Sequence, residues 1–108
     1  MIEQEDAKKY YENAISYDPD FLSPYINLAN LNMTAGKIVE AKNLLTVVLS
    51  KNPALAGVHK NLGLIYLQEN DFNNASKHLR EYLRLKPLAS DARAIQSILK
   101  NELGGNLN

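Results

Sequence analysis

Residues 20–53 read DFLSPYINLANLNMTAGKIVEAKNLLTVVLSKNP, and residues 54–87 read ALAGVHKNLGLIYLQENDFNNASKHLREYLRLKP. Each stretch is 34 residues long, and the alanine at Ala41 recurs at Ala75 and, one period earlier, at Ala7. The end of each period is marked by a proline, at Pro19, Pro53 and Pro87. A fixed period of this length predicts a solenoid in which each unit buries its apolar face against the next.

Each stretch contains two amphipathic segments separated by a short turn. Leu28 and Leu31 in one stretch, like Leu62 and Ile65 in the next, recur with helical spacing on one face. Each proline disfavours helical backbone in the residue before it, so it should end the second helix of its unit. We predict an all-α fold of antiparallel helical hairpins with about six helices, at residues 3–17, 22–35, 38–50, 56–69, 72–84 and 90–102.

The turns and the small residues refine this prediction. Gly36 and Asn70 fall at the ends of the first helices, and these residue types best tolerate a left-handed C-terminal turn. Ala29 and Gly63 fall where a first helix meets its partner, so two backbones can approach closely. We expect a larger residue at either position to overpack, at a cost of about 1–3 kcal/mol.

These positions carry a resemblance to a known family. One unit reads Tyr25-x-x-Leu28-Ala29-x-x-Asn32, Ala41-x-x-x-Leu45-x-x-Val48 and Pro53. The next reads His59-x-x-Leu62-Gly63-x-x-Tyr66, Ala75-x-x-x-Leu79-x-x-Tyr82 and Pro87. The pattern resembles the tetratricopeptide repeat family, with Tyr25 and His59 in place of its leading tryptophan. The resemblance implies a curved stack whose first helices line a groove that binds another polypeptide.

The register gives a domain organisation. We predict one domain over residues 1–103, made of a half-repeat (3–19), repeats at 22–55 and 56–89, and a capping helix (90–102), followed by a flexible tail (104–108). The half-repeat contains only a second helix, so its apolar side has one neighbour instead of two. We expect that side either to associate with a second copy or a partner helix, or to belong to a longer array. Its residues are Tyr10, Tyr11, Ala14 and Ile15.

Residues beside the packing face of the first helices are expected to face the groove. They are Ile26, Asn27, Asn30, Lys60, Asn61, Leu64, Gln68 and Ile95. Asn27 and Asn61 are one period apart, and asparagine carries both donors and an acceptor for a peptide backbone. Equally, these two residues could be solvated, or could bond to each other or to local backbone. A carboxylate clamp, which some members of the family use to hold C-terminal tails, is disfavoured because Asp91 and Ile95 stand where cations are wanted.

Composition excludes several other functions. Twelve basic residues balance twelve acidic ones, so the chain lacks the excess positive charge that nucleic-acid binding needs. It has no cysteine, no phosphate loop and no dinucleotide motif. We expect His59 to be a packed ring and His78 to face solvent. We therefore predict that the protein is not an enzyme. We expect it to bind a protein or peptide, and to bind no metal, cofactor or nucleic acid. Without a signal sequence or membrane segment in this sequence, we expect no membrane insertion; the sequence favours a cytoplasmic location but does not determine the compartment.

Overall fold

The computed structural model describes residues 4–103, and the side chains of residues 5–101. The chain divides into two compact units, Met1–Pro53 and Ala54–Asn108. The boundary falls where the first 34-residue stretch ends, so each unit holds one complete stretch.

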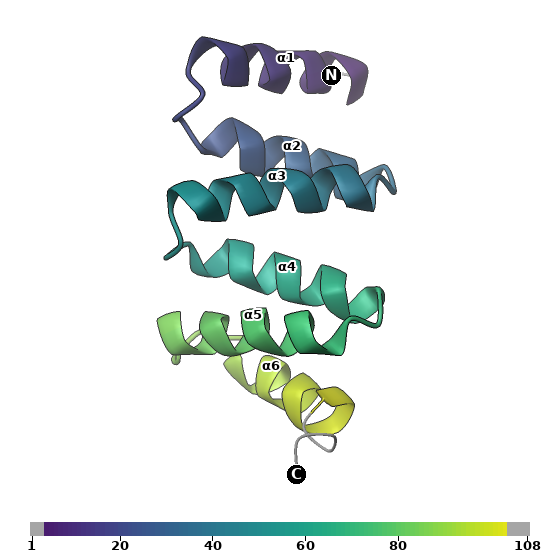
Figure 1. Cartoon of the computed structure of the whole chain (residues 1–108), viewed down its shortest axis with the longest axis vertical. Helices are drawn as coiled ribbons and strands as arrows, with labels where there is room; N and C mark the ends of the chain where they lie inside the picture. The colour runs from purple at the N-terminus through teal and green to yellow at the C-terminus, as the bar shows by residue number, and fades with distance from the viewer. Residues whose placement is uncertain (1–3, 104–108) are drawn as a thin grey trace. The chain divides into compact units, whose positions relative to one another are not determined.

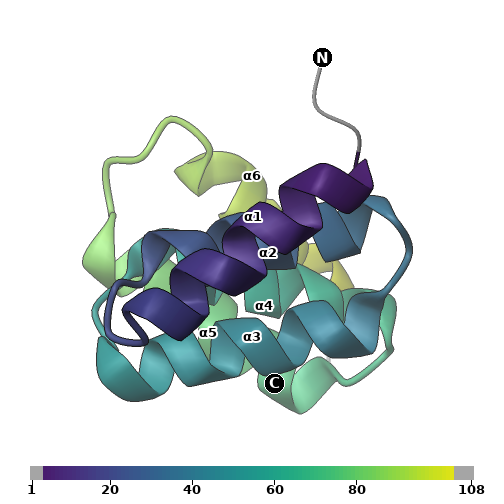
Figure 2. The same cartoon turned by 90° about the horizontal axis from the view of Figure 1, so that it is seen from above.

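Unit 1 consists of three helices, α1 (Gln4–Tyr17), α2 (Ser23–Thr34) and α3 (Ile38–Lys51). They run in alternating directions, with α2 packed against both neighbours (Figure 1). Figure 2 shows α1 crossing over α2. The side chains that the sequence pattern assigns to the core are buried, namely Tyr25, Leu28, Ala29, Ala41, Leu45 and Val48.

Unit 2 contains α4 (Ala56–Gln68), α5 (Phe72–Leu85) and α6 (Ala92–Ile98), followed by a π-helical turn at Leu99–Leu103. The hairpin of α4 and α5 forms its largest packing interface (Figure 1). Its buried cluster consists of Ala56, Ala75, Leu79, Tyr82 and Ile95. The last helix differs from the single α-helix predicted over residues 90–102. It begins at Ala92, and its final turn, Leu99–Leu103, is π-helical.

The turns inside the two hairpins have the same construction. Gly36 has a φ of +79° and Asn70 a φ of +62°, which confirms the left-handed conformation expected of them. The N–H of Lys37 donates to the carbonyl of Asn32 at 2.7 Å, and the N–H of Asp71 donates to that of Tyr66 at 2.9 Å. Such bonds satisfy carbonyl groups that the end of a helix leaves unpaired.

The all-α hairpin architecture predicted from the period is confirmed, and the limits of α1 to α5 agree with the prediction to within about one residue, whereas α6 is shorter than predicted. The finer division into a half-repeat, two repeats and a cap stays a prediction. The predicted flexible tail, residues 104–108, lies outside the described residues.

Candidate functional site

In unit 1, the predicted groove residues lie on α2 beside its buried face. Asn27 and Asn30 are exposed, whereas Ile26 is half-buried. The opposite face of the helix carries Tyr25 and Leu28, which are buried. The unit therefore presents polar amides, flanked by one aliphatic side chain, to whatever approaches this surface.

In unit 2, four of the five predicted groove residues are accessible. Gln68 is exposed, Leu64 is 39% exposed, and Lys60 and Asn61 are half-buried. Ile95 differs, because it is only 4% exposed and belongs to the buried cluster of the unit. A ligand on the surface would not reach the Ile95 side chain, so the expectation that Ile95 faces a groove is wrong.

Lys60 is engaged within unit 2. Its ammonium group donates to Asp91 at 2.8 Å and lies 5.3 Å from the centre of the Tyr82 ring. The hydrogen bond to Asp91 is the main cause of the raised pKa of Lys60. The Tyr82 hydroxyl also donates to Asp91. The two hydrogen bonds, that from Lys60 first, lower the pKa of the Asp91 carboxyl. Lys60 already has a carboxylate partner, which counts against the carboxylate clamp.

Lys60 is paired within its unit, whereas the side-chain amides of Asn27 and Asn61 are not. Neither side-chain amide makes a hydrogen bond to any residue of the part of the chain that the structure describes. The alternative in which each asparagine bonds to local backbone is therefore not realised. Each amide keeps two N–H donors and a carbonyl acceptor for solvent or a ligand.

Of the four residues on the proposed association side of α1, only Tyr10 is exposed, at 70%. Tyr11, Ala14 and Ile15 are half-buried. The Tyr10 and Tyr11 rings meet edge to face with their centres 5.7 Å apart. A contact through this side of α1, whether with a second copy or a partner helix, stays a prediction.

Sequence reasoning missed an aromatic cluster in unit 2. His59 is 8% exposed, which confirms a packed ring. His78 was expected to face solvent, but it is half-buried, its Nδ1 lies 3.0 Å from that of His59, and its ring stacks on Tyr66 at 5.6 Å. One facing nitrogen must donate and the other accept, so the two share a single proton. The sequence does contain a sign of this cluster. In the 34-residue register, Tyr66 lies one helical turn beyond Leu62, on the side of the helix that faces α5.

Lowering the pH is expected to destabilise the folded state through His78. Burial lowers its pKa, and the neighbouring His59 of α4 and Lys77 of α5 lower it further. Below about pH 6.5, the ordinary pKa of histidine, the unfolded chain binds the proton more readily. Stability is therefore full above that pH and falls as the pH drops through the lower pKa of the folded state.

Thermal unfolding followed by circular dichroism between about pH 7.5 and pH 5.5 measures this fall. The matched variant is His78→Leu, because leucine occupies the same slot in unit 1, at Leu44. We expect a flatter pH dependence in the variant than in the natural chain. An equal fall in both proteins would show that His78 is not its source.

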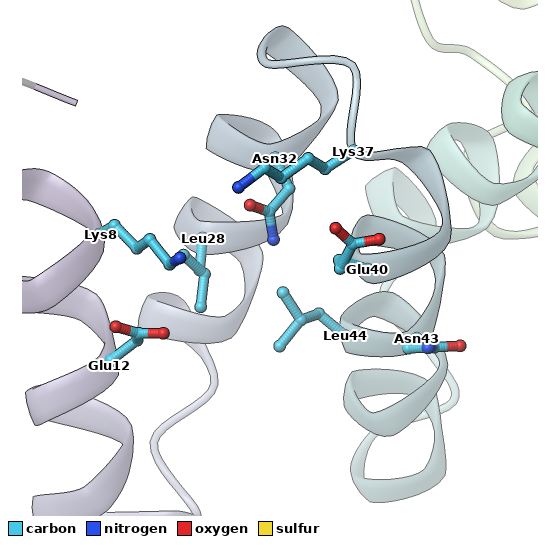
Figure 3. A pocket seen from close by; sticks show the side chains of 8 residues that line it. All are labelled: Lys8, Glu12, Leu28, Asn32, Lys37, Glu40, Asn43 and Leu44. Atoms are coloured by element: carbon cyan, nitrogen blue, oxygen red, sulfur yellow. The ribbon is translucent and has the colours of Figure 1, made fainter. Parts of the chain in front are cut away.

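Unit 1 contains a pocket of about 340 Å³ between α1, α2 and α3. Figure 3 shows the ammonium groups of Lys8 and Lys37 and the amide of Asn32 directed into it, with Leu28 and Leu44 as apolar walls. The remaining lining residues are Glu12, Glu40 and Asn43. The sequence predicted no function for any of these residues.

Asn32 is the unusual member of this lining, because it is only 8% exposed. Its side chain makes no hydrogen bond to a described residue. Within the described residues, no fully enclosed side-chain polar atom lacks a partner. The Asn32 amide must therefore be reached by solvent, and the pocket supplies that access.

Residues 4–103 contain neither a metal site nor a membrane-spanning helix. No three His, Asp or Glu side chains in this part of the chain are grouped so that they could hold a metal ion. None of its helices combines the length and the apolar character that crossing a membrane requires.

Comparisons with known proteins agree with this geometry. Two models described as "Tetratricopeptide repeat" match residues 5–54 and 57–87. The chain is also 28% identical, over 102 residues, to the Arabidopsis thaliana protein "Anaphase-promoting complex subunit 7". That match covers 94% of this chain but spans only 18% of the relative's length. Tetratricopeptide repeats are in general protein-interaction modules. With two matched models of this family and the hairpins that the structure shows, the chain belongs to the tetratricopeptide repeat family.

Proposed function

We propose that this chain is a non-catalytic scaffold that holds a segment of a partner protein against the first helices of its repeats. The observation that carries the proposal is the pair Asn27 and Asn61. The two residues lie 34 residues apart, in the same slot of the repeat period, and neither side-chain amide is bonded to a described residue. A peptide backbone offers a donor and an acceptor at nearly every residue, so repeated amides can bind it whatever its side chains.

The neighbouring side chains add contacts of other kinds. Ile26 in unit 1 and Leu64 in unit 2 are accessible aliphatic groups beside the asparagines. Asn30 and Gln68 add further amides. The surface we propose is thus mixed polar and aliphatic, and Lys60 contributes only its stem, since its charge is paired with Asp91.

The name of the matched relative makes that protein a subunit of a complex. We propose by extension that this chain also acts within a protein assembly, by contact rather than by chemistry. The near-neutral balance of twelve basic and twelve acidic residues fits a partner bound by hydrogen bonds and apolar contacts more than by charge.

Replacing both asparagines is expected to weaken partner binding while leaving the fold intact. The probe is a peptide selected from a random library on the immobilised full chain, and its affinity is measured by isothermal titration calorimetry. In the variant Asn27→Ala with Asn61→Ala, the loss of two hydrogen-bonding groups should weaken binding by about tenfold or more. The helical circular dichroism should not change.

The matched control is Asn73→Ala, an exposed asparagine on α5 that the proposal does not use. It should bind the peptide as the natural chain does. Unchanged affinity in the double variant, with its helices intact, would show that the asparagines are the wrong site.

A further inference from the structure

The two units fill the same place in their hairpins differently. In unit 2, the slot one turn beyond Leu62 holds Tyr66, whose ring is half-buried and stacks nearly parallel on His78. In unit 1, the equivalent slots hold Asn32 and Leu44. An amide and a leucine occupy less space than two stacked rings, and the pocket opens beside these two residues.

We propose that this pocket of unit 1 receives a tyrosine side chain from a partner protein, which supplies the ring that the chain itself provides in unit 2. The proposal adds a second contact to the protein-binding function proposed above, and it rests on that function. Aromatic side chains that enter pockets commonly dominate the affinity of protein interfaces. The volume, about 340 Å³, lies at the small end of the range for ligand pockets.

The lining matches the chemistry of tyrosine. Leu28 and Leu44 offer an apolar surface to the body of the ring (Figure 3). Lys8 and Lys37 direct ammonium groups into the same space, where a cation is attracted to the face of an aromatic ring. These features favour an aromatic side chain over an aliphatic one.

The polar groups of the pocket favour tyrosine over phenylalanine. The Asn32 amide is directed into the pocket and has no partner among the described residues. A phenol hydroxyl both donates and accepts, so it can bond to this amide. A buried tyrosine usually finds a partner for its hydroxyl, and Asn32 would provide one.

The test uses the full chain labelled with ¹⁵N, with N-acetyl-tyrosinamide as the probe and N-acetyl-leucinamide as the aliphatic comparison. Chemical shifts are followed during each titration. We expect the tyrosine probe, with a weak affinity of roughly millimolar order, to shift the side-chain amide of Asn32 and the backbone amides of Lys37 and Leu44. Leucinamide should shift them much less. Equal shifts from both probes, or shifts confined to other residues, would overturn the proposal.

Two variants sharpen the test. Asn32→Tyr places in unit 1 the residue that unit 2 carries, so its own ring should fill the pocket and weaken probe binding by at least about tenfold. Asn32→Ala keeps the pocket open but removes the amide, so it should bind N-acetyl-tyrosinamide and N-acetyl-phenylalaninamide equally. Full tyrosine binding in Asn32→Tyr, or a retained preference for tyrosine in Asn32→Ala, would contradict the assignment. The alanine variant decides the matter if the tyrosine variant does not fold.

The groove and the pocket can fail separately. Asn27→Ala changes a residue outside the pocket lining, so it should leave the shifts caused by N-acetyl-tyrosinamide unchanged. If Asn27→Ala abolishes them, the probe reports on the groove and the pocket proposal is wrong. If the pocket binds tyrosine while the double asparagine variant binds its peptide normally, the groove proposal fails and the pocket stands.

Discussion

Replacing Leu79 with alanine is expected to lower the free energy of unfolding by about 2–5 kcal/mol, the range for a large-to-small change in a packed core. Leu79 has no exposed surface and belongs to the buried cluster that joins α4, α5 and α6. Its truncation would leave a cavity within this cluster. Helices of the cluster cannot close this space without losing other contacts.

Urea denaturation followed by circular dichroism measures the effect, with the free energy extrapolated to zero denaturant. The control is Leu88→Ala, since Leu88 is 96% exposed and its truncation should change stability by less than about 0.5 kcal/mol. If Leu79→Ala were as well tolerated as Leu88→Ala, the packing described for unit 2 would be wrong.

The second large effect is expected at Gly63, where the backbone of α4 lies close to Leu79 of α5. A Cβ atom added at this position would lie 2.6 Å from Cδ2 of Leu79 and 3.3 Å from its backbone nitrogen. Leu79 is enclosed, so its side chain has little room to move aside. Gly63→Ala is therefore expected to destabilise the protein by about 1–3 kcal/mol through overpacking, even though alanine is the better helix former.

Gly57 is the matched control, because it lies in the same helix and a Cβ atom there meets nothing within 4 Å. Gly57→Ala should stabilise the protein by up to about 1 kcal/mol through helix propensity and lower entropy of the unfolded chain. The two glycine variants, compared by urea denaturation, should thus shift in opposite directions. Shifts of the same sign would contradict the close approach of α4 and α5.

Much of the fold could be predicted from the sequence because its determinants are local or periodic. The spacing of Leu28, Leu31 and their counterparts defines one face of a helix without reference to any neighbour. The positive φ angles at Gly36 and Asn70 follow from residue type and from position at the end of a helix. Because the period repeats, the same helix and turn positions are predicted independently in both units.

The candidate site was harder to predict, since it depends on contacts between side chains of different helices. The pairing of Lys60 with Asp91, 31 residues away, needs the path of the chain between α4 and α6. His78 follows the outward-facing Lys77 and precedes the buried Leu79, so only the rotation of α5 decides which way its ring points. Ile95 was assigned to the groove from register alone, and the short α6 buries it instead.

The pocket at Asn32 could be predicted from the sequence only in part. The repeat register aligns Asn32 with Tyr66, and a loss of ring volume at an otherwise equivalent position is visible in the printed sequence. The sequence does not show that α1 lines this pocket through Lys8 and Glu12.

The proposed scaffold function is tested most directly by recording the side-chain amide resonances of Asn27 and Asn61 while the ¹⁵N-labelled full chain is titrated with a library-selected peptide. If a polypeptide binds along the first helices, both amides shift together and saturate at the same peptide concentration, accompanied by the backbone amide of Leu64. If the peptide binds but neither asparagine amide moves, with shifts confined to α1 around Tyr10, the partner is held elsewhere and the groove proposal is wrong.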